Sequence, residues 1–214
     1  MEDRLNFDSN SDKNGGGSSE VVHFQGQEHK NENGGGHKHK NDNQSGHHHE
    51  HEKAAQKIGP VKLAICIVSD SRTIDTDETG KWLKENIKST DGIEEAGYNL
   101  IKNDEEAIKK IVGDFIDSDS HAIIISGGTG LSSKDITIET ITPLFRKTLN
   151  GFGEIFRLLS YEEIGVRAIM SRAVCGTVGN KIIISLPGSK NAVKLAYEKI
   201  IKPQLHHLIY EATR

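Results

Sequence analysis

Four short polar segments of the chain carry the residue types that bind and transfer phosphate groups. They are Ser69–Arg72, Asn103–Asp104, Ser126–Gly130 and Leu186–Ser189. The third reads SGGTG, and closely spaced glycines let backbone N–H groups approach an anion. It lacks the GxxxxGK[ST] and GxGxxG patterns of two common nucleotide-binding loops. The segment therefore indicates either a phosphate-binding loop of another kind or a tight turn without a ligand.

Two carboxylates follow the glycine-rich segment. Asp135 and Glu139 are four positions apart, which places them on one face of a helix that includes Thr137. One or two carboxylates together with substrate phosphates are the usual ligands of Mg²⁺. The pair, with Asp104 from the neighbouring segment, forms either a magnesium platform or a set of acidic helix caps.

Two more segments offer contacts to an anion. Ser189 follows Leu-Pro-Gly and either caps the next helix or holds a second anion beside the helix N–H groups. Arg172, which follows Ser171, either binds a phosphate through two N–H groups or forms a surface ion pair.

Strands that alternate with amphipathic helices position these segments. Apolar runs predict strands over 61–69, 98–102, 121–126 and 180–189. Helical spacing predicts helices over 77–90, 104–118, 137–145 and 191–212, the last interrupted at Pro203. The stretch 149–179 breaks the alternation, with a helix over Glu154–Tyr161 and a short strand near Ala173–Val178, and the pattern alone does not place it in a sheet. The alternation predicts an α/β fold with an open, mostly parallel sheet, whose ligands bind beyond the carboxyl ends of the strands.

Composition divides the 214 residues into two unlike parts. Eight of the 11 histidines and nine of the 22 glycines precede residue 60, with almost no aliphatic residues. We therefore predict a disordered tail over 1–59 and one folded domain over 60–214. The tail is either a solvated linker or a loose ligand for a transition metal. The histidines that would bind the metal are His37, His39, His47, His48, His49 and His51.

Charge and hydropathy exclude several classes of partner. Residues 60–214 carry 20 basic and 21 acidic side chains, so no basic footprint indicates nucleic acid or an anionic membrane. No apolar run approaches the ~20 residues that span a bilayer, and the N-terminus lacks the pattern of a signal peptide. Cys66 and Cys175 stand in apolar runs without a CxxC or Cys/His cluster, so we expect buried, unpaired thiols. A cytoplasmic protein is the resulting expectation.

A family resemblance joins these segments. IVSDSR followed by DETG, SGGTGLSSKDITIE, GFGEIFRLLSYEEIG, SRAVCG and SLPGSKNAV resemble, in order and spacing, the MoaB/Mog family of molybdenum cofactor biosynthesis proteins over 60–214. The GFGEIFRLLSYEEIG stretch is similar to the MoaB branch, and Lys190 departs from the proline of many relatives. The resemblance implies the molybdopterin-binding fold, a three-layer α/β/α sandwich, assembled as a homotrimer or a dimer of trimers.

The resemblance also implies a reaction, which is Mg²⁺-dependent adenylyl transfer from ATP to molybdopterin with release of pyrophosphate. Asp104 and Asp135 match positions of functional carboxylates in the family, which makes them the predicted catalytic residues, and with Glu139 the predicted metal ligands. The predicted substrate-binding residues are Ser69, Asp70, Gly127, Gly128, Thr129, Gly130, Thr137, Glu154, Ser171, Arg172, Pro187, Gly188 and Ser189. The partners implied are the two small-molecule substrates and a metal-insertion protein that receives the product. Two other functions remain open: a catalytically silent molybdopterin carrier, and a nucleotide hydrolase similar to a domain of competence-damage proteins.

Overall fold

A six-stranded sheet forms the middle layer of the fold. The computed structural model describes residues 59–214, so the predicted tail and its histidines lie outside the described residues. The strand order is β2-β1-β3-β6-β5-β4. The strands are β1 (Val61–Val68), β2 (Ile93–Ile101), β3 (Ala122–Ser126), β4 (Lys147–Thr148), β5 (Val174–Val178) and β6 (Lys181–Leu186). β2, β1, β3 and β6 are parallel, and β5 runs antiparallel to both of its neighbours. The predicted α/β class with a mostly parallel sheet is confirmed.

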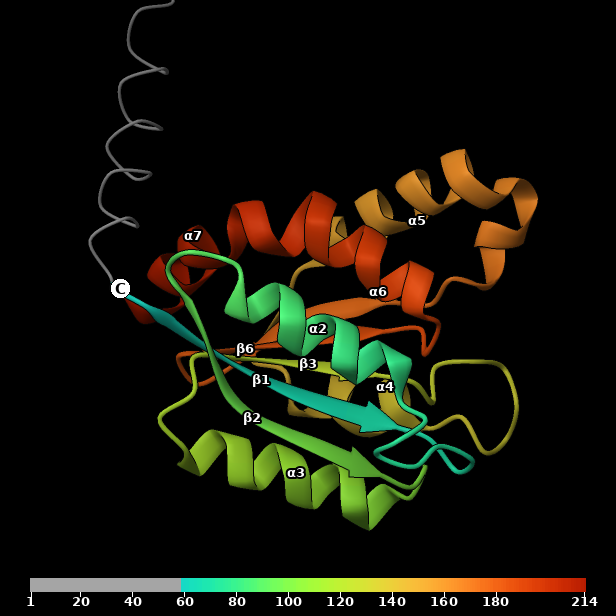
Figure 1. Ribbon diagram of the computed structural model, residues 1–214, viewed down its shortest axis with the longest axis horizontal. Coiled ribbons are helices and arrows are strands. Elements are labelled where there is room, and N and C mark those ends of the chain that lie inside the picture. The colour runs from blue at the N-terminus through green and yellow to red at the C-terminus, as the bar shows by residue number, and fades with distance from the viewer. Residues whose placement is uncertain (1–58) are drawn as a thin grey trace, which may run out of the picture. The chain divides into compact units, whose positions relative to one another are not determined.

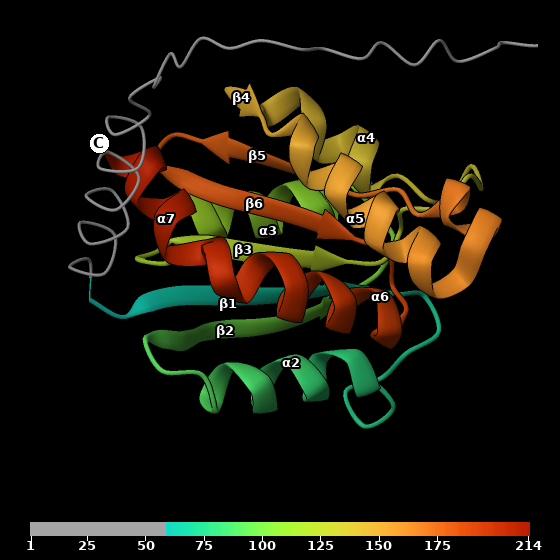
Figure 2. The same cartoon turned by 90° about the horizontal axis from the view of Figure 1, so that it is seen from above.

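Helices cover both faces of the sheet. They are α2 (Glu78–Lys88), α3 (Glu105–Asp117), α4 (Thr137–Ile141), α5 (Asn150–Ile164), α6 (Lys190–Ala196) and α7 (Lys202–Thr213). Short 3₁₀ helices η1 (Thr142–Leu144) and η2 (Gly165–Met170) follow α4 and α5, and the π-helical segment η3 (Tyr197–Ile201) joins α6 to α7. α2, α5, α6 and α7 lie on one face and α3 and α4 on the other (Figures 1 and 2). Within residues 59–214 no helix is long and apolar enough to cross a membrane.

Each face of the sheet packs against its own hydrophobic cluster. In β1, Leu63 and Ile65 join the cluster with α2, α6 and α7, whereas Cys66 and Val68 join the cluster with α3. A strand buried on both faces is apolar at every position, which explains the continuous runs of β1, β3 and β6. Cys66 and Cys175 are buried free thiols as predicted, and burial raises the pKa of each to about 12.

Several element boundaries differ from the predictions. β2 begins at Ile93, five residues before the predicted start at 98. The sequence pattern missed this first half because β2 is an edge strand, and with Glu94 and Glu95 exposed the segment has no apolar run. The unplaced strand is β5, which forms a hairpin with β6 through a turn where Gly179 has a φ of 60°. α5 is longer than the predicted helix, and α4 with η1 ends near the predicted boundary.

Candidate functional site

A cavity of about 450 Å³ opens at the carboxyl edge of the sheet, where the loops after β1, β3 and β6 meet. The arrowheads of these three strands point to that edge in Figure 2. Parallel strands thus bring distant polar segments of the sequence together. The residues that line the cavity are Val68, Ser69, Asp70, Ser71, Arg72, Asn103, Gly127, Gly128, Thr129, Gly130, Asp135, Pro187 and Gly188. Most of the predicted substrate-binding residues are therefore brought to one place.

Glycines let the loops at this cavity pack backbone against backbone. Gly127 has a φ of 109°, and a Cβ there would lie 2.1 Å from the carbonyl oxygen of Val68. A Cβ on Gly188 would lie 3.2 Å from the Cα of Gly127. The Gly127 N–H donates to the Leu186 carbonyl at 3.0 Å, which ties the β3 loop to the end of β6. The predicted tight turn is present, and phosphate binding by its amides stays a prediction.

Substitution of Gly127 tests this packing. We expect Gly127→Ala to lower the free energy of unfolding by more than about 1 kcal/mol, because alanine strains the positive φ and meets a backbone oxygen. Urea unfolding of the purified variant measures the loss. Gly151→Ala in α5 is the matched control, since nothing lies within 4 Å of a Cβ added there. A Gly127→Ala protein as stable as the control would contradict the close approach.

Thr137 lies beneath the glycine-rich loop rather than in the cavity. Its hydroxyl donates to the Gly127 carbonyl at 2.8 Å, and its N–H donates to the Gly128 carbonyl at 2.9 Å. The side chain is fully buried. In the structure Thr137 fixes the backbone of the loop, and its contact with a substrate stays a prediction.

Two carboxylates, Asp70 and Asp135, line the cavity. Asn103 connects the segments that carry them: its N–H donates to Asp70 Oδ1 at 3.0 Å, and its side-chain amide donates to the carbonyl of Lys134. The amide oxygen of Asn103 is buried and accepts no hydrogen bond within residues 59–214. A buried acceptor without a donor costs free energy, so this oxygen is available to a ligand that brings a donor or a cation.

Glu139 faces Arg172 rather than the cavity. Arg172 Nη2 pairs with Glu139 Oε1, and Arg172 Nη1 donates to the Gly130 carbonyl at 2.8 Å. The hydrogen bond from Arg172 holds the pKa of Glu139 below its ordinary value. Of the two roles predicted for Arg172, the structure shows the ion pair, and the same side chain braces the glycine-rich loop.

The structure does not bring the three predicted magnesium ligands together. Asp104 is exposed and caps α3, its Oδ1 accepting the Ala107 N–H at 2.9 Å, and it is not among the residues that line the cavity. Glu139 is neutralised by Arg172. Across the described part of the chain no group of three or more His, Cys, Asp or Glu side chains is placed to hold a metal ion. Asp135 alone of the three predicted ligands borders the cavity.

Besides Thr137 and Arg172, three more of the predicted substrate-binding residues lie outside the set that lines the cavity. Ser189 caps α6, its hydroxyl accepting the Ala192 N–H at 3.3 Å, which is one of its two predicted roles. Glu154 is exposed on α5, and Ser171 ends η2. Contact of these three with a substrate stays a prediction that the cavity itself does not require.

Arg72 lines the cavity and was not among the predicted site residues. Its Nη2 donates to the Gly188 carbonyl at 3.0 Å, and its Nη1 donates to the Thr79 hydroxyl at 3.1 Å. The guanidinium thereby joins the loop after β1 to the loop after β6. The sequence could have indicated Arg72 as a site residue, because it directly follows the Ser-Asp-Ser at the end of the first apolar run.

A buried carboxylate holds Arg72 in place. Asp77 is fully buried at the N-terminus of α2, and its Oδ1 lies 3.4 Å from Arg72 Nη1. Its Oδ2 accepts hydrogen bonds from the Tyr98 hydroxyl at 2.7 Å and from the Gly80 N–H at 3.1 Å. Burial, and then the neighbouring Asp77 carboxylate, raise the pKa of Tyr98 above its ordinary value. The negative charge is thus compensated from three sides, and the arginine it orients borders the cavity.

Fold and site together define a doubly wound α/β protein with a small-molecule cavity at the carboxyl edge of its parallel strands. Residues 64–207 match the family model described as "Probable molybdopterin binding domain". The chain belongs to this family of molybdenum cofactor biosynthesis proteins.

Relatives with known names and structures agree with this assignment. Molybdenum cofactor biosynthesis protein B of Staphylococcus aureus (strain COL) is 48% identical over 156 residues, which cover 72% of this chain and 93% of that protein. A crystal structure of a molybdenum cofactor biosynthesis protein B matches with a TM-score of 0.69 at 40% identity, covering 72% of this chain and 96% of that one. The tungsten cofactor synthesizing protein MoaB from Pyrococcus furiosus matches with a TM-score of 0.65 at 34% identity, covering 72% and 98%. The predicted family and fold are confirmed.

Proposed function

We propose that the protein transfers the adenylyl group of ATP to molybdopterin, giving adenylylated molybdopterin and pyrophosphate. The observation that carries the proposal is that Asp70, Asp135 and Arg72 line the same cavity as the Gly127–Gly130 loop. Carboxylates, a guanidinium and glycine amides are the groups that position and neutralise phosphates. Membership of the family supports molybdopterin as one substrate.

The terminal phosphate of molybdopterin is the nucleophile in this reaction. A phosphate monoester has a second pKa of about 6, so the group is largely ionised at pH 7 and needs no strong base. One of its oxygens bonds to the α-phosphorus of ATP. The bond from that phosphorus to the oxygen bridging to the β-phosphorus breaks, and pyrophosphate leaves with the electron pair. Positioning and charge neutralisation therefore supply the catalysis.

Each segment that lines the cavity has a separate role in the proposed reaction. The backbone N–H groups of Gly127–Gly130 bind a phosphate of one substrate, and Thr137 and Arg172 keep that loop rigid through its carbonyl groups. Arg72, held by Asp77, supplies positive charge on the opposite loop. Ser69 and Gly188 border the same space from the ends of β1 and β6.

Mg²⁺ fits the acidic part of the cavity. Asp135 would bind the ion, and Asp70, which Asn103 connects to the same segment, is a second carboxylate within the cavity. Proteins usually supply one or two carboxylates to a magnesium site, and substrate phosphates supply the other ligands. Bound there, the ion would neutralise charge on the transferred phosphate groups. The orphaned Asn103 oxygen is a further oxygen ligand of the kind that Mg²⁺ prefers. Asp104 and Glu139 have no part in this arrangement.

Release of pyrophosphate tests the reaction. The full chain is incubated with ATP, Mg²⁺ and molybdopterin, and the pyrophosphate released is measured with inorganic pyrophosphatase. We expect release that requires molybdopterin and stops when EDTA removes Mg²⁺. Release of AMP and pyrophosphate without molybdopterin would instead indicate a nucleotide hydrolase, and molybdopterin binding without release would indicate a silent carrier.

An exposed apolar surface supports the proposed homo-oligomer. We define the α5 face as Ile155, Leu158, Tyr161 and Ile164 of α5 together with Val166, Ile169 and Met170 of η2, all exposed. α5 and η2 extend beyond the sheet at its carboxyl edge (Figures 1 and 2). A contiguous apolar face of this kind marks an interface in soluble proteins. We infer that copies of this chain associate through it, as a trimer or a dimer of trimers, and that a metal-insertion protein receives the product.

Charge on the α5 face should dissociate this assembly. Leu158 is 60% exposed, so Leu158→Glu leaves the protomer's fold intact and places a carboxylate in the interface. Light scattering after gel filtration is expected to show an oligomer for the wild type and a protomer for Leu158→Glu. Ile116→Glu on α3 is the control, since Ile116 is exposed on the other helical layer. Dissociation by Ile116→Glu, or none by Leu158→Glu, would contradict the proposed interface.

A further inference from the structure

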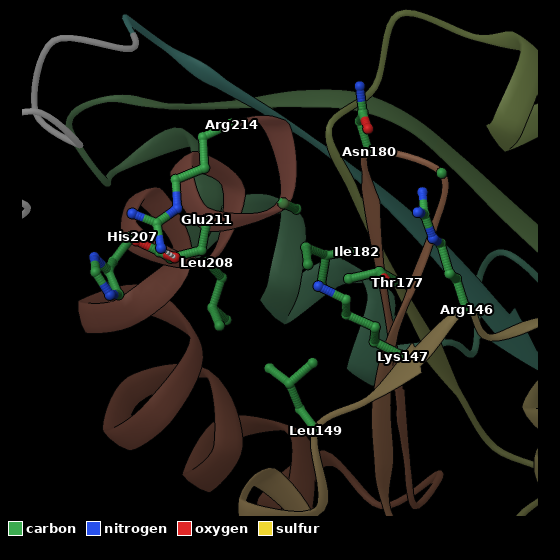
Figure 3. Close-up of a pocket in the computed structure, with 12 residues that line it drawn as sticks. Arg146, Lys147, Leu149, Thr177, Asn180, Ile182, His207, Leu208, Glu211 and Arg214 are labelled. Carbon is green, nitrogen blue, oxygen red and sulfur yellow. Dashed lines mark ion pairs between the residues drawn. The ribbon is translucent and has the colours of Figure 1, made fainter.

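A second cavity of about 450 Å³ lies away from the carboxyl-edge site. It opens between β4, the turn from β5 to β6, and α7, so it borders the amino end of β6 (Figure 3). None of its lining residues belongs to the first cavity. We call it the α7 cavity. Its volume is in the range of pockets that hold small organic molecules.

The inner surface of the α7 cavity is apolar. Leu149 from the end of β4, Ile182 from β6 and Leu208 from α7 point toward the space between these elements (Figure 3). Ala212, one turn further along α7, leaves room beside them. An apolar floor of this size favours a ligand with a ring or a short aliphatic body.

The mouth of the α7 cavity carries unpaired positive charge. Figure 3 shows the Lys147 side chain extending from β4 into the space toward α7, whereas the Arg146 side chain extends in another direction, alongside the turn from β5 to β6. Within residues 59–214 neither side chain has a hydrogen bond or an ion pair. The third cation, Arg214, pairs with Glu211 at 2.8 Å. Lys147 therefore presents to the cavity a positive charge that no side-chain carboxylate of residues 59–214 pairs with.

The α7 cavity combines an apolar surface with a positive charge, and one type of ligand matches both. An apolar body would cover Leu149, Ile182 and Leu208, and an anionic group would pair with Lys147. Thr177 and Asn180 supply neutral polar atoms at the rim, which can fix a ligand's orientation. We propose that the α7 cavity binds a small organic anion, with a carboxylate, sulfonate or phosphate on a planar or aliphatic body. The site is separate from the adenylyl-transfer site and does not depend on that function.

Lys147 could also serve only to protect the edge of the sheet, and that role predicts no binding of a ligand. Lysine on an edge strand prevents pairing with another sheet, and β4 is the edge strand of this sheet. That role requires charge but no ligand. Binding of a probe that has both an anionic group and a ring therefore separates the two explanations.

The test uses 2-naphthoate as the probe and the leucine methyl signals of the full chain as the readout. We expect saturable shifts at Leu149 and Leu208, with 2-naphthalenemethanol binding about tenfold more weakly, because it lacks the charge that pairs with Lys147. Inorganic phosphate, which has no apolar body, should not compete at equal concentration. Equal binding of the acid and the alcohol, or shifts confined to Leu158 of the α5 face, would overturn the proposal.

Two variants and a control test whether the positive charge and the apolar surface of the α7 cavity bind the probe. Lys147→Met keeps the length of the side chain and removes its charge, and it should weaken 2-naphthoate about tenfold. Ala212→Trp should fill the cavity and abolish the shifts. Lys88→Met removes an exposed lysine of α2 that does not line the cavity and should leave the affinity unchanged. Unchanged binding in Lys147→Met would overturn the proposal, and the pyrophosphate assay, unaffected by Lys147→Met, keeps this result distinct from the proposed function.

Discussion

Asp135→Asn is expected to lower kcat for adenylyl transfer by about 100-fold or more, while molybdopterin still binds. Asparagine keeps the size of the side chain but removes the charge. Asp135 is the predicted metal ligand that lines the cavity, so its charge is the one that holds a cation against the substrate phosphates. Because this interaction matters most in the transition state, kcat falls and the affinity for the pterin does not. Steady-state pyrophosphate release and equilibrium binding of molybdopterin measure the two effects.

Glu139→Gln is the matched control for Asp135→Asn. The two carboxylates are four positions apart in the sequence, but Glu139 is engaged by Arg172. An exposed ion pair contributes at most about 1 kcal/mol, so its loss should change kcat by less than about fivefold. Activity of Glu139→Gln as low as that of Asp135→Asn would support Glu139 as a metal ligand. Full activity of Asp135→Asn would refute the role of Asp135.

Asp77→Ala is expected to lower the free energy of unfolding by about 3 kcal/mol or more. The substitution removes the helix cap that accepts the Gly80 N–H and leaves the partly buried Tyr98 hydroxyl without an acceptor. It also leaves Arg72 without its counter-ion, although the Arg72 side chain is 31% exposed and water can solvate it. We therefore take the lower end of the range for a broken buried ion pair. Urea unfolding at a fixed protein concentration measures the change.

Two further variants separate the parts of the Asp77 network. Tyr98→Phe removes one hydrogen bond and should cost about 1 kcal/mol. Asp75→Ala, two residues before Asp77, removes an exposed carboxylate and should stay within about 0.5 kcal/mol of the wild type. If Asp77→Ala were no less stable than Asp75→Ala, the buried carboxylate would not be holding Arg72 and α2 together.

The parts of the fold that were predicted from sequence are those that local patterns determine. β1, β3 and β6 are buried on both faces, so each is an unbroken apolar run, and the loops after them could be found without knowing the sheet order. Helix capping was one of the two roles predicted for Asp104 and for Ser189 from their place after a strand, and each of them caps a helix. β4 has two residues, and the direction of β5 depends on a hairpin, so neither has a local signature strong enough to place it.

The parts of the site that were missed depend on contacts between distant residues. Glu139 pairs with Arg172, 33 positions away, and no local pattern tells whether a carboxylate at the start of a helix faces a cavity or an arginine. Arg72 reaches Gly188 across 116 positions. Helical spacing placed Asp135 and Glu139 on one face, but α4 begins at Thr137, so Asp135 precedes the helix and turns toward the cavity.

Transfer of label from ATP tests the central proposal most directly. The full chain is incubated with molybdopterin, Mg²⁺ and ATP labelled with ³²P at the α-phosphate, and the products are separated by chromatography. We expect the label to move onto the pterin with the wild type and to stay in ATP with Asp135→Asn. Label found only in ATP or in free AMP after incubation with the wild type would contradict it.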